Sequence, residues 1–446
     1  MAGVQSIEQL QAMLRAHGVR TAYVKALAPK QDNEKNQIVL GGGLEGAVNL
    51  FPARILPRAA SQSVAKSKSS AGQPKLEAQI DLDWLDDHGR RWPAPGTRII
   101  DYFQYPEIRL SGFLGRCASP PDALRRDRQA LYGQRWLILG TAGDGRVVGV
   151  VLTERDDPLA RAMPGLPHLS RRSILRVLTV DAAAGSDPAE LLHQEMAAIV
   201  RAGWHWSRIN RGGVIQPFSG AQGGGYTLEA LLGVAANGEK APDRHGFEIK
   251  SFSGSRISLM TPTPDLGFQG ERPFREFMHR YGHAARKGDG SLRFTGLYRV
   301  GAPNSSTGYE LSVRGYDRQT DTFDDASRVA VELTDPVDGS LIAGWSLEKL
   351  ANCWNAKHAS ALYIAFDSRE GAAGAEYCYN ARWLIGRGTD VWRLLRAIDA
   401  GVVFHDPAHT LYADGRPKVR PQWRINASSL AAAMSRLYAD CSVVTV

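Results

Sequence analysis

The hydrophobic and polar positions of the first 178 residues alternate in a way that predicts short β-strands rather than helices. Alternating or short apolar runs occur at 37–40, 47–51, 97–103, 135–140 and 147–153. The last two runs lie in WLILGTAGDGRVVGVVL, where Gly-Asp-Gly joins them, and this predicts a β-hairpin. Many short strands with few helices predict a small barrel or sandwich for this part of the chain.

A different pattern begins after residue 180. The segment TVDAAAGSDP is rich in small residues, which predicts a linker at 181–186 between a domain of residues 1–180 and a domain of residues 187–446. Ser186 as an N-cap and Pro188 in the first turn predict that a helix follows. Further helices are expected at 341–353, 389–399 and 427–439, and strands at 247–252, 256–261, 293–300, 308–314 and 361–366. This mixture of helices and strands predicts an α/β or α+β fold for the second domain.

Composition narrows the class of protein. The 446 residues are 43% hydrophobic and 22% charged, which supplies cores for two domains. No run approaches the ~20 apolar residues of a membrane helix, and the N-terminus lacks a signal pattern, so we expect no membrane partner and a cytoplasmic location. No G-x-x-x-x-G-K-[ST] loop occurs, so ATP is not an expected ligand. Four widely spaced cysteines predict neither a zinc site nor a disulfide framework.

The net charge of +8 makes nucleic acid a candidate partner. Most of the basic residues are arginines, whose planar guanidinium suits the reading of guanine and phosphate. A GC-rich genome would also favour arginine codons, so both explanations stay open.

Residues 223–261 contain the strongest candidate chemistry. Thr227 is predicted to cap a helix that runs through Gly233 and carries Glu229 in its first turn. After a loop, FEIKSF predicts a strand that places Glu248 and Lys250 on one face and its apolar residues on the other. Asp243 lies just before this strand, so a short turn would set it beside Glu248.

Such a set of residues suits metal-dependent phosphodiester hydrolysis. Two carboxylates in one pocket repel each other unless a hard divalent cation lies between them, and Mg²⁺ prefers oxygen ligands. Lys250 would then position a water or help to deprotonate it. The alternative is a solvated Glu–Lys ladder on an exposed strand, but Phe and Ile alternate with the charges, which favours a buried site.

The spacing within this segment also resembles that of a known family. Glu229 is followed by thirteen residues, Asp243, four residues and Glu248-x-Lys250, within GG-x-TLE, PD-x-x-G-x-EIKS and ISLMTP. This block resembles the MvaI/BcnI family of Type II restriction endonucleases, a branch of the PD-(D/E)xK nuclease fold. The resemblance, taken over residues 186–446, implies a bacterial, Mg²⁺-dependent endonuclease. Such an enzyme acts as a monomer on double-stranded DNA at a short C/G-rich site and cuts one strand at a time.

The same resemblance assigns roles to the four residues. Asp243 and Glu248 would bind the metal, Lys250 would orient the hydrolytic water, and Glu229 would assist as a helical carboxylate. A repair nuclease of the same fold, or a DNA-binding regulator with an inactive nuclease domain, remains an alternative. The complete set of four residues argues against the inactive regulator.

The N-terminal part is similar to an EcoRII-like B3-type effector domain, a pseudobarrel, around PEIRLSGFLGR and the following hairpin. This likeness implies that Glu107 and Arg109 read cytosine and guanine, with Arg98 as a further recognition arginine. A surface salt bridge is the alternative for the pair. Both families are associated with CCWGG, so the N-terminal domain is expected to bind a further copy of the site.

Two other segments are candidate DNA contacts. The first, LAPKQDNEKNQIVL, supplies Lys30, Asn36 and Gln37, with a polar loop as the alternative. The second alternates Arg416, Lys418, Arg420 and Arg424, so these side chains would share one face of an extended segment. Pro417 and Pro421 confine that segment to a sheet edge or a loop.

Overall fold

The structure is a computed structural model that describes residues 3–27, 37–41, 50–58, 76–102, 107–169, 173–180, 188–236, 243–372 and 374–446. Lys30, Asn36, the linker at 181–186 with Ser186, and most of the strand expected at 47–51 lie outside the described residues. The chain divides into two compact units, with the division after Pro188. Each unit is described by itself.

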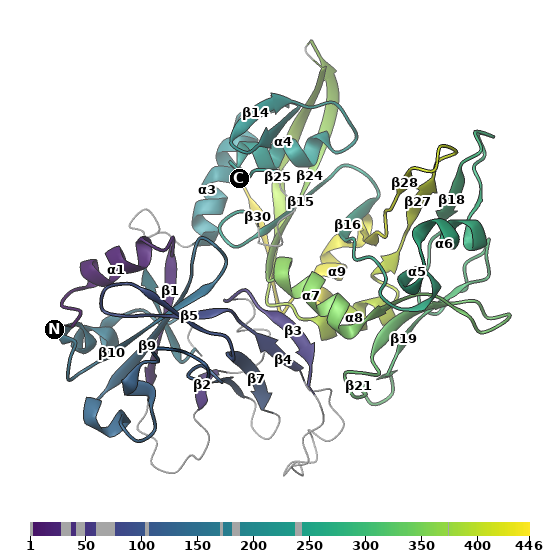
Figure 1. Cartoon of the computed structure of the whole chain (residues 1–446). Coiled ribbons are helices and arrows are strands. Elements are labelled where there is room, and N and C mark those ends of the chain that lie inside the picture. Colours follow the sequence, from purple (N-terminus) through teal and green to yellow (C-terminus); the bar gives the residue numbers. More distant parts are fainter. Residues whose placement is uncertain are drawn as a thin grey trace. The chain divides into compact units, whose positions relative to one another are not determined.

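The first unit contains two β-sheets (Figure 1). One has the strand order β11 (Leu175–Thr179), β1 (Thr21–Leu27), β9 (Arg135–Thr141), β10 (Val147–Thr153), β5 (Leu82–Leu85) and β6 (Arg91–Ala94). The other has the order β2 (Gln37–Gly41), β8 (Glu107–Ser111), β7 (Arg98–Tyr102), β4 (Leu76–Gln79) and β3 (Arg54–Pro57). The described strands form open sheets and no closed barrel.

Helix α1 (Ile7–Arg15) begins at Ser6, whose side chain accepts a hydrogen bond from Gln9 N. It packs Leu10 and Leu14 onto the six-stranded sheet, in a core shared with Ile138 and Val148. Short 3₁₀ helices lie at η2 (Asp122–Leu124), η3 (Gln129–Tyr132) and η4 (Pro158–Gly165). The predicted hairpin is confirmed, because β9 and β10 pair antiparallel from Thr141 opposite Val147.

The second unit is built on a sheet in the order β12 (Trp204–Trp206), β25 (Gly374–Arg387), β24 (Ser360–Gly371) and β15 (Glu248–Phe252). Strand β15 runs parallel to β24, and β30 (Asp440–Thr445) pairs antiparallel with β25. Helices α3 (Pro188–Arg201) and α4 (Gly223–Leu231) share a core with this sheet, in which Leu192, Leu228 and Ile249 are buried. A hairpin of β13 (Arg208–Arg211) and β14 (Val214–Pro217) precedes α4.

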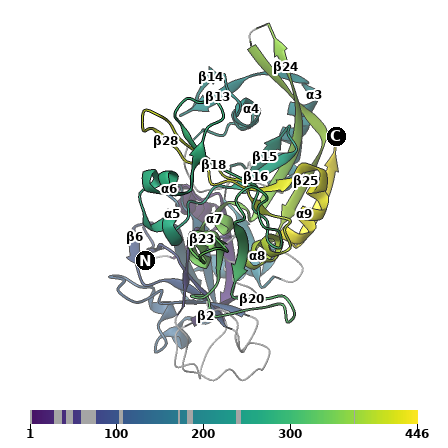
Figure 2. The same cartoon turned by 90° about the vertical axis from the view of Figure 1, so that its right-hand side faces the viewer.

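Smaller sheets make up the rest of the second unit. Their strand orders are β16 (Arg256–Met260), β29 (Trp423–Asn426), β26 (Phe404–His405); β17 (His283–Ala284), β18 (Leu292–Thr295), β27 (Ala408–Leu411), β28 (Pro417–Lys418); β19 (Glu310–Arg314), β22 (Ala330–Thr334), β23 (Leu341–Ser346); and β20 (Tyr316–Asp317), β21 (Thr322–Phe323). The helices are α5 (Gly267–Glu271), α6 (Phe274–Tyr281), α7 (Leu347–Lys357), α8 (Val391–Asp399) and α9 (Leu430–Leu437), with η6 (Ala427–Ser429) before α9. Helices α8 and α9 lie side by side (Figure 2).

The prediction of a helix over 341–353 is wrong in its first half. Residues Leu341–Ser346 form β23, and the Ser346 side chain then caps α7 by accepting from Lys349 N at 3.1 Å. The apolar run before Ser346 has a length that fits either element, and the pairing with β22 makes it a strand. The helix expected at 389–399 is confirmed as α8.

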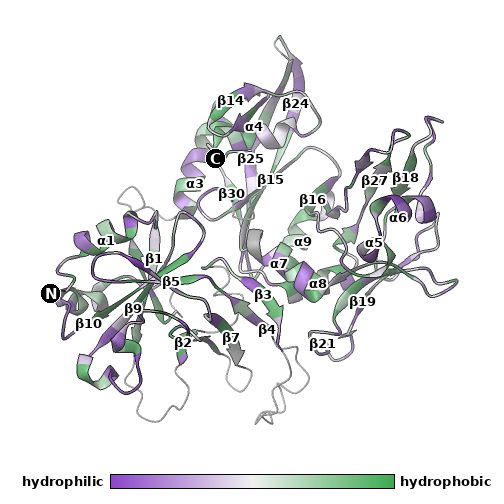
Figure 3. Cartoon of the chain, viewed as in Figure 1, coloured by the Kyte–Doolittle hydropathy of each residue, from purple (hydrophilic) through white to green (hydrophobic). Residues whose placement is uncertain are grey.

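Hydropathy follows this architecture, with polar residues at exposed tips such as that of β24 (Figure 3). Within the described residues, no helix is both long and apolar enough to cross a membrane.

Candidate active site

Strand β15 carries two of the four predicted catalytic residues on one face. Lys250 Nζ donates a hydrogen bond to Glu248 Oε1 at 2.6 Å. The Glu248 side chain is 4% exposed and the Lys250 side chain is 21% exposed, so the carboxylate is buried while the ammonium side of the pair keeps some contact with solvent. Phe247 and Ile249 are buried in the core below, because alternate residues of a strand point to opposite sides. The predicted alternation is confirmed.

Helix α4 carries Glu229, but it begins earlier than the sequence predicted. It spans Gly223–Leu231, so Glu229 lies in its last turn rather than its first. Thr227 is not its N-cap; the buried Thr227 Oγ1 accepts from Arg208 N on β13 at 3.0 Å. A carboxylate near the C-terminal end of a helix is opposed by the helix dipole, so helix stability does not explain Glu229 at this position.

The glycines at the start of α4 allow the helix to pack closely on the sheet. A Cβ on Gly224 would lie 2.2 Å from the Phe366 ring, and one on Gly223 would lie 2.1 Å from the Tyr377 hydroxyl oxygen. Tyr379 Oη donates to Gly224 O at 2.7 Å and ties the helix to β25. The Gly-rich segment therefore has a packing role beside the site.

Asp243 lies before a tight turn that leads into β15. Arg244 and Phe247 exchange backbone hydrogen bonds of 3.1 and 2.8 Å across His245–Gly246. Asp243 Oδ2 accepts a hydrogen bond from Ile249 N at 2.8 Å, which folds the aspartate back over the strand. The short turn expected from the sequence is present.

The electrostatics show that the four residues act on one another. Burial lowers the pKa of Lys250. The carboxylates of Glu248, Asp243 and Glu229 raise the same pKa by a larger amount, so its net shift is upward. The Glu248 carboxylate is hydrogen-bonded to this ammonium group, and the Asp243 and Glu229 carboxylates are near enough to act on it electrostatically. The structure brings all four predicted catalytic residues together.

This donor set fits a hard divalent cation. Carboxylate oxygens are the ligands that Mg²⁺ prefers, and Mg²⁺ keeps several waters, so one or two protein carboxylates suffice. Among the described residues, no three His, Cys, Asp or Glu side chains are arranged as a complete metal cage. Asp243 and Glu248 are the residues that would hold the cation.

In the first unit, most of the predicted DNA contacts share one face of the five-stranded sheet. Arg109 Nε donates to Glu107 Oε1 at 2.8 Å, and Arg109 Nη1 donates to Gln37 Oε1 at 3.2 Å. Ser111 pairs with both Gln37 and Arg98, which places those two residues on the same face as Glu107 and Arg109. On the opposite face, Ile99, Ile108 and Leu110 are buried.

Sequence reasoning missed further polar members of this face, among them Glu77, whose Oε2 lies 3.7 Å from Arg98 Nε. Arg54 lies opposite Gln79 and donates to its Oε1 at 3.2 Å, and Gln79 in turn lies opposite Arg98. Neither β3 nor β4 was among the strands expected from the sequence, so only the strand pairing reveals these residues.

The second basic segment is divided between two sheets, which corrects the prediction of one shared face. Lys418 is in β28, the edge strand of its sheet, and Arg424 is in β29 of another sheet. Arg416 is 75% exposed and pairs with Asp414 at 2.6 Å. Arg420 is exposed, and its backbone N donates to the His409 ring. The confinement to an edge expected from the two prolines is confirmed for Lys418.

Arg424 takes part in a polar network that sequence reasoning missed. Its Nη1 and the Nη1 of Arg256 both approach Asp406 Oδ2, at 2.9 and 2.8 Å. Arg424 also donates to Ser258 Oγ at 3.1 Å and to Gln422 Oε1 at 2.8 Å. These groups come from β16, β29 and the end of β26, whose pairing was not predictable from local pattern.

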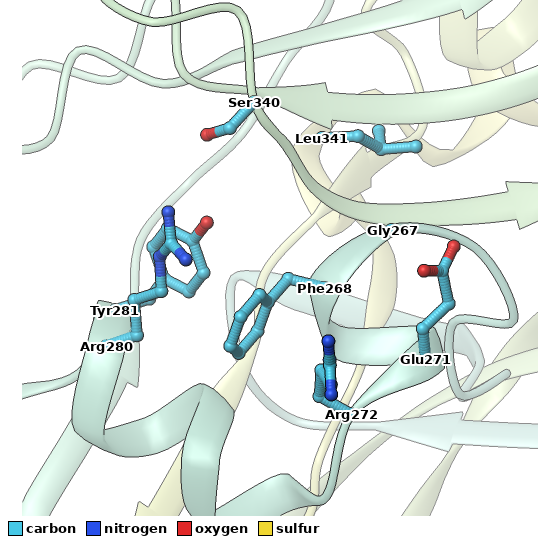
Figure 4. A pocket seen from close by; sticks show the side chains of 8 residues that line it. All are labelled: Gly267, Phe268, Glu271, Arg272, Arg280, Tyr281, Ser340 and Leu341. Carbon is cyan, nitrogen blue, oxygen red and sulfur yellow. The ribbon is translucent and has the colours of Figure 1, made fainter.

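A separate pocket of about 410 Å³ lies beside α5, α6 and β23 (Figure 4). Phe268 and Tyr281 lie edge to face in it, and the Arg280 guanidinium stacks 4.9 Å from the Phe268 ring centre. None of the four predicted catalytic residues lines this pocket.

Comparison with known proteins identifies the second unit. The model of the MvaI/BcnI restriction endonuclease family matches residues 193–433, more than half of the chain and all four site residues. Similar solved structures include restriction endonuclease MvaI in complex with its cognate DNA substrate, at 23% identity over 58% of this chain and 99% of that chain, with a TM-score of 0.44. MvaI in the absence of DNA is 21% identical over 59% of this chain and 99% of that chain, with a TM-score of 0.32. No curated protein sequence matches significantly. The chain belongs to the MvaI/BcnI restriction endonuclease family and is a Type II site-specific DNA endonuclease.

Proposed function

We propose that the protein is a Mg²⁺-dependent restriction endonuclease that cuts double-stranded DNA at CCWGG. We further propose that it acts as a monomer whose single active site cuts the two strands in succession. One observation carries the catalytic part of this proposal, namely that Lys250 is hydrogen-bonded to Glu248 at 2.6 Å while Asp243 accepts a hydrogen bond from Ile249 N, the backbone group between them, at 2.8 Å. Membership of the family supports the reaction class.

The chain's own residues would divide the work of hydrolysis. Asp243 and Glu248 would hold Mg²⁺, which neutralises charge at the scissile phosphate and acidifies a bound water. The partly exposed Lys250 ammonium would donate a hydrogen bond to the attacking water and orient it toward phosphorus. Glu229, from the last turn of α4, would accept a hydrogen bond from the same water layer and keep it in place.

We propose that the network around Arg424 recognises the DNA bases in the second unit. A guanidinium forks onto guanine O6 and N7, and a carboxylate accepts from cytosine N4, so Arg424, Arg256 and Asp406 provide the groups that a C·G pair requires. The Arg424 side chain remains 24% exposed and that of Arg256 43% exposed, which leaves their outer donors accessible.

The first unit is proposed to be a B3-like effector domain that binds a further copy of the site. The polar face with Gln37, Arg98, Glu107 and Arg109 supports this assignment, since it combines arginines, a carboxylate and an amide above an apolar core. Lys30 and Asn36 are proposed to extend this contact. Arg416, Lys418 and Arg420 are proposed phosphate contacts of the second unit.

A plasmid with one CCWGG site tests the catalytic proposal. With Mg²⁺ and enzyme below the plasmid concentration, supercoiled DNA should pass through a nicked intermediate before linear product appears. Mapping the ends should place both cuts within CCWGG, and chelation with EDTA should stop the reaction. Ends elsewhere would refute the specificity, and linear product without transient nicked circles would refute sequential cutting by a monomer.

A further inference from the structure

Helix α3 contacts the turn that separates the two candidate metal-binding carboxylates. Arg244 Nε donates to Glu195 Oε2 at 3.0 Å, and Arg244 Nη2 donates to Glu195 Oε1 at 2.5 Å. This two-point geometry fixes direction as well as distance. His245 Nε2 lies 3.2 Å from the same Glu195 Oε1. One carboxylate of α3 therefore holds Arg244 by two hydrogen bonds and lies close to the ring of the next residue, His245.

The turn held in this way sets the relative position of Asp243 and Glu248. His245 and Gly246 have φ of +49° and +81°, a left-handed pair that bends the chain sharply, and histidine adopts this conformation less readily than glycine. Asp243 comes directly before Arg244, and Glu248 follows Phe247. A change in the turn would therefore move one carboxylate relative to the other.

Helix α3 is itself a rigid support. Leu192 and Met196 are fully buried and Ile199 is 8% exposed, and all three share a core with Phe247 and Ile249 on either side of Glu248. Burial raises the pKa of Glu195, but the neighbouring Arg244 and His245 outweigh this effect, so the net shift of this pKa is downward.

We propose that Glu195 is a positioning residue that, through Arg244 and His245, holds the Asp243 turn in the geometry needed to bind the divalent cation. This inference rests on the proposed function, since it takes Asp243 and Glu248 as the metal ligands. Supporting residues behind metal ligands commonly change metal affinity by about 10- to 100-fold when they are replaced.

The test compares Glu195→Gln with a matched control on the same helix. Glu190→Gln removes an exposed carboxylate whose contact is with Gln194, away from the turn. For each full-length variant, Ca²⁺ binding is measured by titration calorimetry without DNA, and cleavage is measured as a function of Mg²⁺ concentration. Glu195→Gln should weaken Ca²⁺ binding and raise the half-activating Mg²⁺ concentration by about 10-fold or more. Saturating Mg²⁺ should restore most of the rate.

A second variant checks that the effect passes through the ion pair. Arg244→Gln breaks the same contact from the other side and should produce a similar shift. The double variant Glu195→Gln/Arg244→Gln should add little, because both changes remove one interaction. Glu190→Gln should match the wild type in both measurements.

The outcomes separate this inference from the proposed function. Suppose that the wild type and Glu190→Gln depend on metal as expected. If Glu195→Gln and Arg244→Gln then show the same metal dependence as the wild type, the positioning role is overturned while the proposed function stands. Lower activity at every Mg²⁺ concentration with unchanged Ca²⁺ affinity would also overturn it, since that result indicates general destabilisation. If the wild type itself cleaves equally in EDTA, the proposed metal dependence fails, and the inference fails with it.

Discussion

Replacing Lys250 with methionine removes the ammonium group and keeps most of the side-chain volume. The change leaves the Glu248 carboxylate, 4% exposed, without the Lys250 donor at 2.6 Å. Removing one partner of a buried pair costs about 3–5 kcal/mol of folding stability, and the 21% exposure of Lys250 places the expected loss near the lower end, at about 3 kcal/mol.

The rate of cleavage should also fall, independently of this loss of folding stability. Loss of one preorganised donor at a charged transition state lowers kcat by about 10²–10³-fold, which corresponds to about 2.7–4 kcal/mol of transition-state stabilisation. DNA affinity should change little, because Lys250 serves the reacting phosphate more than the bound ground state. The expected signature is therefore a large loss of rate with nearly intact binding.

Three measurements separate these effects. Single-turnover cleavage of a one-site duplex gives the rate, binding to the same duplex with Ca²⁺ gives the affinity, and urea unfolding without metal gives the stability. Asp243→Asn is the companion variant: it should abolish cleavage equally but keep stability, since an amide oxygen still accepts the hydrogen bond from Ile249 N. Cleavage by Lys250→Met within severalfold of the wild type, or a loss of binding that matches the loss of rate, would refute the assignment of Lys250.

Other features of the structure lead to further expectations. Asp243→Asn should bind two CCWGG duplexes per chain. Adding Arg109→Ala should weaken binding at the site in the first unit by about 1–3 kcal/mol, so that one duplex per chain remains tightly bound. Titration with site and mismatch duplexes measures this stoichiometry, and an unchanged value would make Arg109 a surface ion pair. Gly224→Ala should destabilise the second unit by about 1–3 kcal/mol, because its Cβ would lie 2.2 Å from an aromatic ring of β24. Gly254→Ala is the control and should leave stability unchanged, because no atom lies within 4 Å of its Cβ. Burial lowers the pKa of His409 to about 4. An unfolded histidine binds its proton near pH 6.5, so the stability contributed by neutral His409, up to about 3 kcal/mol, should be complete above that pH and decline toward pH 4. His409→Gln should lack this component, and equal urea stability profiles over this pH range would contradict the reasoning.

Local pattern was enough to predict which residues form the candidate site. The spacing of Glu229, Asp243, Glu248 and Lys250 and the alternation within FEIKSF are properties of a short segment, and a strand places alternate residues on one face whatever surrounds it. The hairpin of β9 and β10 followed in the same way, since its turn residues and its flanking apolar runs lie within a few residues of one another.

Tertiary structure decided the features that depend on partners distant in sequence. Residues Leu341–Ser346 became a strand because β22 supplies the hydrogen bonds, and α4 begins at Gly223 because glycines there can approach the sheet. Asp406 meets Arg424 and Arg256 only through the pairing of β26, β29 and β16. Glu195 reaches Arg244, 49 positions away, only because both α3 and β15 bury their apolar sides in one core. Such contacts depend on long-range packing, which the periodicity of any single segment does not contain.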